Sequence, residues 1–396
     1  MQKNKQASAP HHSPGRRAVC DLVNRLFKAQ ACPAPEYESF ATMTWDYSHL
    51  SPPSDSGEIP KREFLPLEKL GWKPFFSEQT SADDLAEAVP VRVVEVHRKG
   101  LHVVGESFDA FIPPGPDAAA GDWFLYDQHD PSRSKILQRS SLFERRAAGT
   151  EHKRQLITAN VDTVFIVSSC NKEFNVARLE RYLVLAFEAE VTPVILLTKA
   201  DLCDDPAPYV EAASAISNRV VVELLNALSH EPIAKLSRWC GLGQTVAFLG
   251  SSGVGKSTLV NALFKDDVAD TAAIRENDNK GRHTTTRRQL RFTPEGCAVL
   301  DTPGMRELQL TNVKAGIADL FSDMADLVSQ CRFNDCQHDS EPGCAIQNAI
   351  ELGEIDPSRF ARWNKLVLEE RSNSSSMAAR GTDNRSQLKR TKKTKQ

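Results

Sequence analysis

The most constraining feature of this sequence is a glycine-rich loop at residues 250–257, GSSGVGKS, which matches the pattern GxxxxGK[ST] in full. An apolar segment, QTVAFLG, leads into the loop, and a segment with helical spacing, STLVNALF, follows it. A strand, a loop and a helix in this order surround a phosphate with backbone N–H groups and a helix N-terminus. We therefore expect a phosphate site built from Gly250, Ser251, Ser252, Gly253, Val254, Gly255, Lys256, Ser257 and Thr258.

Magnesium is expected beside this loop. Lys256 should reach the β- and γ-phosphates, and the Ser257 hydroxyl should coordinate Mg²⁺. The segment DTPG at 301–304 ends an apolar strand, which would place Asp301 near the ion and let Gly304 offer its N–H to the γ-phosphate. On its own DTPG is equally good turn chemistry, so its weight comes from its position after the phosphate loop.

A polar stretch between these two motifs contains GRHTTT at residues 281–286. A threonine hydroxyl in such a segment can complete the magnesium shell when a γ-phosphate is present, as in a switch loop. We assign this role to Thr285, although the sequence does not distinguish it from its two neighbours. A solvated loop with a run of threonines is the alternative.

The segment TKAD closes another apolar strand, TPVILL, and is expected to recognise a base. An aspartate can accept two hydrogen bonds from the ring N–H and the exocyclic amine of guanine, which adenine cannot supply, and the lysine stem can cover the base. These residues are Thr198, Lys199, Ala200 and Asp201. In ordinary GTPases the phosphate loop precedes the base motif; here the base motif comes first, so the domain is expected to be circularly permuted.

The residues before this α/β region predict a small β domain. Five short apolar or β-branched segments between 89 and 142 are separated by turns such as Pro113-Pro114-Gly115. Five short strands without helical spacing favour an OB-type barrel, with an ordinary small sandwich as the alternative.

Four potential metal ligands occur within 14 residues near the C-terminus, namely Cys331, Cys336, His338 and Cys344. Three thiolates and one imidazole form a closed tetrahedral Zn²⁺ site. The absence of an open ligand position favours one structural zinc ion. Reduced, unliganded cysteines are the alternative.

The combination of these motifs resembles the ribosome small-subunit-dependent GTPases, the RsgA/YjeQ family of circularly permuted GTPases. The resemblance spans roughly residues 64 to 370. The motifs that carry it are GDW (Gly121–Trp123), ANVD (Ala159–Asp162), RLERYL (Arg178–Leu183), TKAD, GSSGVGKST, GRHTTT, DTPGMREL and the cysteine cluster.

Composition, the strand and helix patterns and the resemblance together predict five parts. These are an N-terminal extension over 1–63 that we expect to be disordered, an OB-fold domain over 64–150, a permuted GTPase domain over 151–312, a helical zinc-binding domain over 313–371, and a disordered basic tail over 372–396.

The resemblance also implies a catalytic role for His283, which would position or activate the attacking water; a surface loop histidine is the alternative. The residue after DTPG is Met305, which cannot orient water as a glutamine does, so we expect slow intrinsic hydrolysis. Two positions depart from the usual GTPase pattern. Thr198 stands where many GTPases have asparagine, and Asn226-Ala227 stands in place of the usual Ser-Ala base contact.

The expected partners are GTP, GDP and the small ribosomal subunit with its rRNA. The subunit and its rRNA are implied by the resemblance. The net charge of −3 excludes a protein that coats nucleic acid, so RNA contacts should come from local basic patches. The patches comprise Arg139, Arg145, Arg146, Lys153 and Arg154; Arg287, Arg288 and Arg291; and Arg385, Lys389, Arg390, Lys392, Lys393 and Lys395. A solvated face is the alternative for each.

No apolar run approaches the roughly 18 residues that a membrane helix needs, and the N-terminus lacks the apolar core of a secretory signal. We therefore expect a cytoplasmic protein without a membrane partner, and a monomer because no heptads are present.

The function that we expect is hydrolysis of GTP in late maturation of the small ribosomal subunit, with nucleotide-dependent movement passing from the segment after DTPG to the zinc domain. Two alternatives belong to other classes. One is an RNA-binding assembly factor in which the nucleotide is only a structural ligand. The other is a phosphate-loop ATPase or small-molecule kinase.

Overall fold

The structure is a computed structural model that describes residues 66–97, 99–113, 117–146, 154–229, 231–264, 289–301, 310 and 312–374. The chain divides into two units, Met1–Lys61 and Arg62–Gln396, and every described residue belongs to the second unit. The extension predicted over 1–63 and most of the basic tail lie outside the described residues. Within them, no helix is long and apolar enough to cross a membrane.

The first part of the fold is a small antiparallel sheet, as the sequence predicts. Its strands lie in the order β3-β2-β1-β4-β5, and each pairs with its neighbour in antiparallel fashion. Three short helices precede it, α2 (Pro66–Lys69), α3 (Pro74–Ser77) and α4 (Ala82–Glu87). The strands are β1 (Val89–His97), β2 (Gly100–Gly105), β3 (Phe108–Ile112), β4 (Trp123–Tyr126) and β5 (Lys135–Ile136). Among the described residues, β3 and β5 do not pair to close the sheet into a barrel.

Alternate side chains of this sheet enter two separate hydrophobic clusters, because successive residues of a strand point to opposite faces. One cluster joins Val91, Val93 and Phe124 with Leu101, Val103 and Ile112. The other joins Trp123 and Leu125 with Phe76 and Leu137. A separate hairpin, β6 (Leu142–Arg146) and β7 (Arg154–Ala159), follows the sheet.

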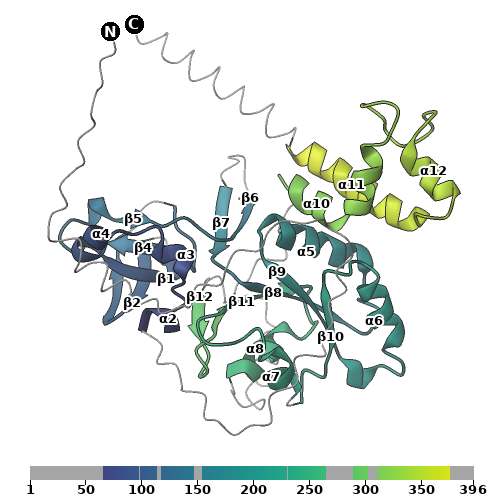
Figure 1. The fold of residues 1–396 in the computed structure, drawn as a ribbon. Coiled ribbons are helices and arrows are strands. Elements are labelled where there is room, and N and C mark those ends of the chain that lie inside the picture. Colours follow the sequence, from purple (N-terminus) through teal and green to yellow (C-terminus); the bar gives the residue numbers. More distant parts are fainter. Residues whose placement is uncertain are drawn as a thin grey trace, which may run out of the picture. The chain divides into compact units, whose positions relative to one another are not determined.

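A mostly parallel sheet with helices on both faces forms the centre of the fold (Figure 1), as predicted for 151–312. Its strand order is β10-β9-β8-β11-β13-β12, and only β12 runs antiparallel to its neighbour within this group. The strands are β8 (Thr163–Ser169), β9 (Thr192–Thr198), β10 (Val221–Leu224), β11 (Thr245–Gly250), β12 (Gln289–Phe292) and β13 (Ala298–Asp301).

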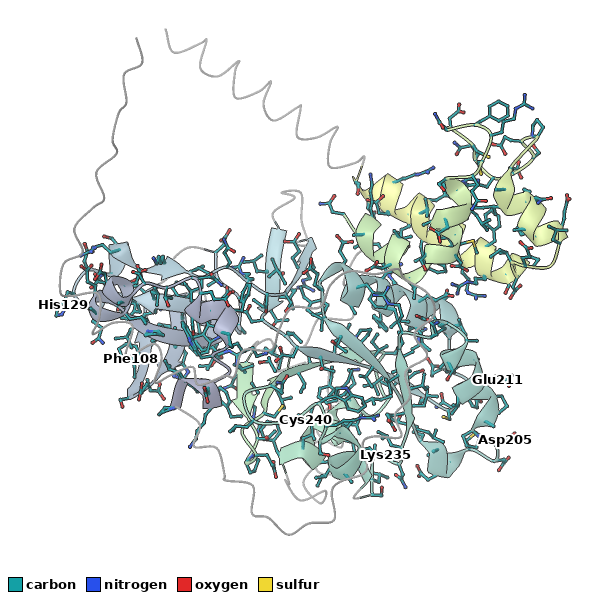
Figure 2. The ribbon with its side chains drawn as sticks, in the orientation of Figure 1. Phe108, His129, Asp205, Glu211, Lys235 and Cys240 are labelled. Atoms are coloured by element: carbon teal, nitrogen blue, oxygen red, sulfur yellow. The ribbon has the colours of Figure 1, made fainter. Side chains whose placement is uncertain are left out.

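The two faces of this sheet are covered by different helices. Val164, Ile166 and Leu249 pack in the cluster that contains α5 (Val176–Glu188), α6 (Ala207–Ser214) and α10 (Lys314–Leu320). Phe165, Val167 and Phe248 pack on the opposite face with α7 (Glu231–Leu236) and α8 (Lys256–Phe264). Cys240, labelled in Figure 2, follows α7 and belongs to this second cluster.

The strand order confirms the predicted circular permutation. β11, which leads into the phosphate loop, lies between β8, which precedes it in the chain, and β13, which follows it. The strand that ends in TKAD, β9, is therefore made before β11 but lies on the far side of β8. Because these strands are parallel, their carboxyl ends meet at one edge of the sheet, where ligands bind in open α/β folds.

The GDW and ANVD motifs form a joint between the small sheet and the central sheet. Gly121 adopts a φ of +95°, and a Cβ there would lie 2.1 Å from the carbonyl oxygen of Ala159. Asn160 accepts a hydrogen bond from the Ser140 N–H at 2.9 Å and donates one to the Gly121 carbonyl at 3.0 Å. These motifs therefore fix the path of the chain between the two sheets.

Two cations strengthen this joint at the amino end of the central strands. Lys73 forms an ion pair with Asp162, whose second carboxylate oxygen accepts the Thr245 N–H at 2.8 Å. Arg92 is fully buried and donates to the Thr245 hydroxyl at 2.8 Å and to the Leu70 carbonyl at 2.5 Å. Burial lowers the pKa of Arg92 to about 10, so the guanidinium still carries its charge at neutral pH.

The C-terminal part is helical, with α10 followed by α11 (Ser322–Val328), α12 (Ala345–Glu351) and a helix over 357–374. The sequence predicted that a disordered tail begins at Ser372, and the structure shows residues 372–374 as helical. The Asn373 amide donates to the Leu310 carbonyl at 2.7 Å, and this bond holds this turn in place.

Gly316 lets α10 pack closely on α5. A Cβ at this position would lie 2.2 Å from the Val184 carbonyl oxygen, and the Gly316 N–H donates to Glu188 Oε2 at 2.8 Å. We predict that Gly316→Ala lowers the free energy of unfolding by about 1–3 kcal/mol, because the helices must separate. Chemical denaturation of the full chain measures this change.

Gly241→Ala is the matched control for this substitution. A Cβ at Gly241 would meet its nearest neighbour, Gln244 Cγ, at 3.9 Å, an ordinary contact distance. This variant should stay within about 0.5 kcal/mol of the parent chain. Equal effects of the two substitutions would show that the close approach of α10 and α5 does not govern stability.

Candidate functional site

The phosphate loop follows β11 directly, and its glycines have the conformations that such a loop requires. Gly250 has a φ of +142°, and a Cβ there would lie 2.3 Å from the Val167 carbonyl oxygen of β8. Gly253 and Gly255 have φ values of +75° and +96°. Nothing lies within 4 Å of a Cβ built on Gly253, so this part of the loop faces open space. Val254 is buried and anchors the loop in the core.

The loop leads into α8, as the sequence predicts. The Leu259 N–H donates to the Gly255 carbonyl at 3.0 Å, which closes the first helical turn. The Lys256 ammonium donates to the carbonyls of Gly250, at 2.8 Å, and Ser251. Lys256 therefore extends back over the loop. Ser257 is exposed at the first turn of the helix, and Thr258 is buried.

The base motif lies beside this loop because β9 is separated from β11 only by β8. Thr198 is fully buried at the end of β9, and its hydroxyl lies 2.6 Å from the Val254 carbonyl oxygen and 3.1 Å from that of Ser168. Thr198 thus binds the base motif to the phosphate loop. This contact gives a structural reason for a hydroxyl where many GTPases have an amide.

The next residues of the motif turn outward. Lys199 has a left-handed conformation, with a φ of 59°, and Ala200–Leu202 forms a single 3₁₀ turn. Asp201 is exposed, and no described residue bonds to its carboxylate. Both carboxylate oxygens are therefore available as acceptors at this edge of the sheet.

Asn226 and Ala227 lie at the same edge. The Leu225 N–H donates to the Leu197 carbonyl at 2.9 Å, so these two residues follow immediately after the paired part of β10 and β9. The methyl group of Ala227 lies 3.8 Å from a Cβ built on Gly255. The Asn226 carbonyl Oδ1 accepts the Leu228 N–H at 2.9 Å and shapes the turn.

Four predicted site residues fall wholly or partly outside the described structure. Asp301 ends β13, next to β11, but its side chain is not described. Gly304, His283 and Thr285 lie outside the described residues. The assignments of these residues stay predictions.

Arg178, the first residue of RLERYL, contacts the phosphate loop, a role that was not predicted from the sequence. It lies in the first turn of α5, whose N-cap Asn175 accepts the Arg178 N–H at 2.9 Å. Its Nη1 donates to Ser251 Oγ at 2.7 Å. An asparagine cap after a buried strand predicts a helix N-terminus at the carboxyl edge of the sheet, and this is the sequence signal that could have identified it.

The four predicted metal ligands are brought together at the other functional centre of the chain. All four ligand atoms lie within 4.8 Å of one another. Cys331 Sγ is 4.0 Å from Cys344 Sγ, and each of these sulfurs is 3.6 Å from His338 Nδ1. Zinc bonds of about 2.3 Å to sulfur and 2.0–2.1 Å to nitrogen in a tetrahedron give separations of about 3.8 and 3.6 Å. The donor set and its spacing therefore fit zinc.

The surrounding backbone holds this cluster in shape. Cys344 is the N-cap of α12, and its sulfur accepts the Gln347 N–H at 3.5 Å. The Glu341 carboxylate accepts backbone N–H groups of Gln337, Asp339 and Ser340, and these bonds lower the pKa of Glu341 to about 2. Burial lowers the pKa of His338, which favours the neutral imidazole that binds metals.

One residue of the predicted basic patches has a structural role. Arg139 pairs with Asp122, with Nε and Nη2 at 2.7 and 2.8 Å from the two carboxylate oxygens. Asp122 is fully buried and also accepts the Ala119 N–H at 2.7 Å. Arg139 therefore supports the joint between the sheets, and its assignment to an RNA-binding patch stays a prediction.

Comparisons with known proteins agree with this geometry. The family description "RsgA GTPase" matches residues 136–311. "Small ribosomal subunit biogenesis GTPase RsgA 2" of Vibrio parahaemolyticus is 46% identical over 323 residues, which cover 81% of this chain and 90% of that protein. The RsgA protein of Mesorhizobium japonicum is 48% identical over 315 residues, which cover 78% of this chain and 90% of the relative.

Solved structures show the same architecture. The crystal structure of YjeQ from Thermotoga maritima has a TM-score of 0.53 and 27% identity, and the match covers 71% of this chain and 98% of that one. The structure of YloQ, described as a circularly permuted GTPase, has a TM-score of 0.50 and 22% identity over 72% of this chain and 96% of that one. The second likeness concerns the fold alone.

The cysteine cluster generates a direct test. We predict that the purified full chain contains about one zinc ion and that Cys336→Ser reduces this content strongly, because a closed site loses one of its four ligands. Elemental analysis by mass spectrometry measures the metal. Hydrogen exchange in α12 should also rise, since Cys344 caps this helix.

Cys203→Ser is the matched control, because Cys203 is partly buried and lies outside the cluster. This variant should keep the zinc content of the parent chain. Full zinc occupancy in the Cys336→Ser variant would contradict the assignment of the four ligands.

Proposed function

Since the chain belongs to the RsgA family of circularly permuted GTPases, we propose that it hydrolyses GTP on the small ribosomal subunit during late maturation of that subunit in the cytoplasm. The observation that carries the nucleotide part is the bond between Thr198 and the Val254 carbonyl. It joins the base motif to the phosphate loop, so that one nucleotide can contact both. The ribosomal part is supported by the relatives, which are small ribosomal subunit biogenesis GTPases.

We assign guanine recognition to the TKAD segment. The exposed Asp201 carboxylate would accept hydrogen bonds from the ring N–H and the exocyclic amine of guanine, and the Lys199 stem would cover the base. Ala227 lies against the loop at Gly255, as Thr198 does, and would also border the base. These contacts favour GTP over ATP.

The phosphate loop would hold the β- and γ-phosphates. Lys256 would exchange its bonds to the loop carbonyls for bonds to phosphate oxygens. Ser257, exposed at the start of α8, and Thr285 would hold Mg²⁺, which neutralises the developing charge, with Asp301 beside them. Gly304 would donate its N–H to the γ-phosphate.

Hydrolysis requires a water molecule that attacks the γ-phosphorus as the bond to the β–γ bridging oxygen breaks. We assign the positioning of this water to His283, whose imidazole can accept a proton near neutral pH. Met305 follows DTPG and cannot do this. Turnover should therefore be slow until a partner positions His283 beside the attacking water.

We propose that the cysteine cluster holds one structural zinc ion and that the flanking small sheet and helical region bind rRNA. The zinc site has no open ligand position, so it serves the fold rather than the reaction.

The central prediction concerns GTP turnover by the purified protein. The rate should be low for the protein alone, rise strongly with isolated small ribosomal subunits, and stay low with ATP. His283→Ala should abolish the stimulated turnover while nucleotide binding is kept. Phosphate release measures the turnover of the parent chain and of the variant.

Large subunits at equal concentration are the control for this experiment. Turnover that small subunits do not change would contradict the ribosomal assignment and leave the GTPase assignment intact. If the His283→Ala variant still supported subunit maturation in cells, the nucleotide would be a structural ligand of an assembly factor, the first alternative.

Guanine selectivity is tested separately. Asp201→Asn should weaken GTP binding by about 1–3 kcal/mol, as expected when a hydrogen bond to a charged group is lost. Titration calorimetry with GTP and ATP measures the change. The control Asp205→Asn alters an exposed aspartate that bonds only its own loop, through the Ala207 N–H, and should have little effect. Unchanged GTP affinity in the Asp201→Asn variant would favour the ATPase or kinase alternative.

A further inference from the structure

One basic side chain from outside the nucleotide motifs bonds to the phosphate loop. Arg178 Nη1 donates to Ser251 Oγ at 2.7 Å and lies 3.5 Å from the Glu173 carbonyl oxygen. The Arg178 side chain is 41% exposed, so the guanidinium lies at the surface of the loop and not in the core. Because Ser251 is the second residue of the loop, a shift of the loop backbone acts directly on this bond.

The next turn of α5 bonds to the C-terminal helix over 357–374. The Glu180 carboxylate is fully buried, and both of its oxygens lie 2.9 Å from Arg362 Nε. Arg181 donates two bonds to Glu369, at 2.7 and 2.5 Å. Residues three apart are neighbours on a helix surface, so Arg178 and Arg181 lie on the same side of α5. One helical turn therefore separates the contact with the phosphate loop from the contacts with the C-terminal helix.

The body of α5 is suited to act as one rigid element. Leu179, Leu183, Val184 and Ala186 are buried against the central sheet. The buried Glu180 carboxylate depends on Arg362, since an ionised carboxylate without a partner is costly in the protein interior. A small displacement of α5 therefore changes the strength with which the C-terminal helix is held.

We propose that Arg178 is a positioning residue that couples the phosphate loop to the helix over 357–374 through α5. This inference rests on the proposed function, because it takes the loop to bind GTP and GDP. Coupling between two sites is reciprocal. A nucleotide that moves Ser251 changes the docking of the C-terminal helix, and a change at that helix alters nucleotide affinity. This route differs from the one through the segment after DTPG.

A double-mutant cycle tests the coupling on the full chain. Dissociation constants for fluorescent GDP and for a non-hydrolysable GTP analogue are measured for the parent, Glu369→Gln, Arg178→Ala and the double variant. Glu369 lies on the C-terminal helix, away from the nucleotide motifs, yet Glu369→Gln should change at least one dissociation constant by about three-fold or more. In the Arg178→Ala background this effect should disappear, and Arg178→Lys, which keeps one donor, should restore part of it.

A matched control removes a comparable ion pair elsewhere. Glu87→Gln breaks the exposed pair between Glu87 and Arg133 in the N-terminal part and should leave both dissociation constants unchanged. Arg181→Gln breaks the Arg181–Glu369 pair from the other side, should reproduce the effect of Glu369→Gln, and replaces it if that variant folds poorly. Hydrogen exchange of residues 357–374 should also respond to nucleotide in the parent and not in Arg178→Ala.

The inference is overturned if Glu369→Gln has no effect on affinity, or if its effect is the same with and without Arg178. Both results are distinct from failure of the proposed function. If the proposed function failed, the parent chain would bind neither guanine nucleotide, and no dissociation constant could be measured for comparison.

Discussion

The parallel pairing of β8 with β9 on one side and β11 on the other is the interaction on which the rest of this structure depends. The register aligns Ser169 with Thr198 and Gly250 with Val167, so β8 and β9 end together and β11 ends at the same edge of the sheet, opposite Val167. At this edge the Thr198 hydroxyl reaches the Val254 carbonyl, and the lack of a side chain at Gly250 lets the two backbones approach. Two motifs separated by 49 positions thereby become parts of one nucleotide site.

The strand β8 also separates the nucleotide site from the point where the small sheet is attached. Asp162 immediately precedes β8 and bonds with Lys73 and with the Thr245 N–H, while Ser169 ends the strand beside the nucleotide edge. A strand rises about 3.3 Å per residue, so these two points lie about 23 Å apart. These bonds anchor the small sheet at the amino ends of the central strands, and its strand β1 also pairs with β12, where Glu95 lies opposite Gln289. The helix α5 contacts the C-terminal helix near the carboxyl ends of the central strands.

Features coded by short stretches of sequence were predictable, and features made by distant partners were not. The phosphate loop, TKAD and the four metal ligands each lie within 14 residues, so spacing alone indicated their chemistry. Arg139 looked like a surface cation because its partner, the buried Asp122, lies 17 positions away and its burial depends on the packed sheet. Likewise, nothing local in RLERYL shows that Arg178 meets Ser251, 73 positions later. The helical conformation of residues 372–374 was not predicted, because the Asn373 amide that stabilises this polar turn bonds to the Leu310 carbonyl, 63 positions earlier.

The permuted strand order also determines how the sheet can assemble during synthesis. A chain emerging from the ribosome delivers β8 first, then β9 and β10, which pair in sequence on one edge of β8. β11 then adds to the other edge of β8, and it brings the phosphate loop to a base motif that already exists. The strand β12 has one neighbour made before it, β1, and one made after it, β13, which lies between β12 and β11. Each strand from β9 to β13 therefore has at least one neighbour that is already made, and the central sheet can grow outward from β8.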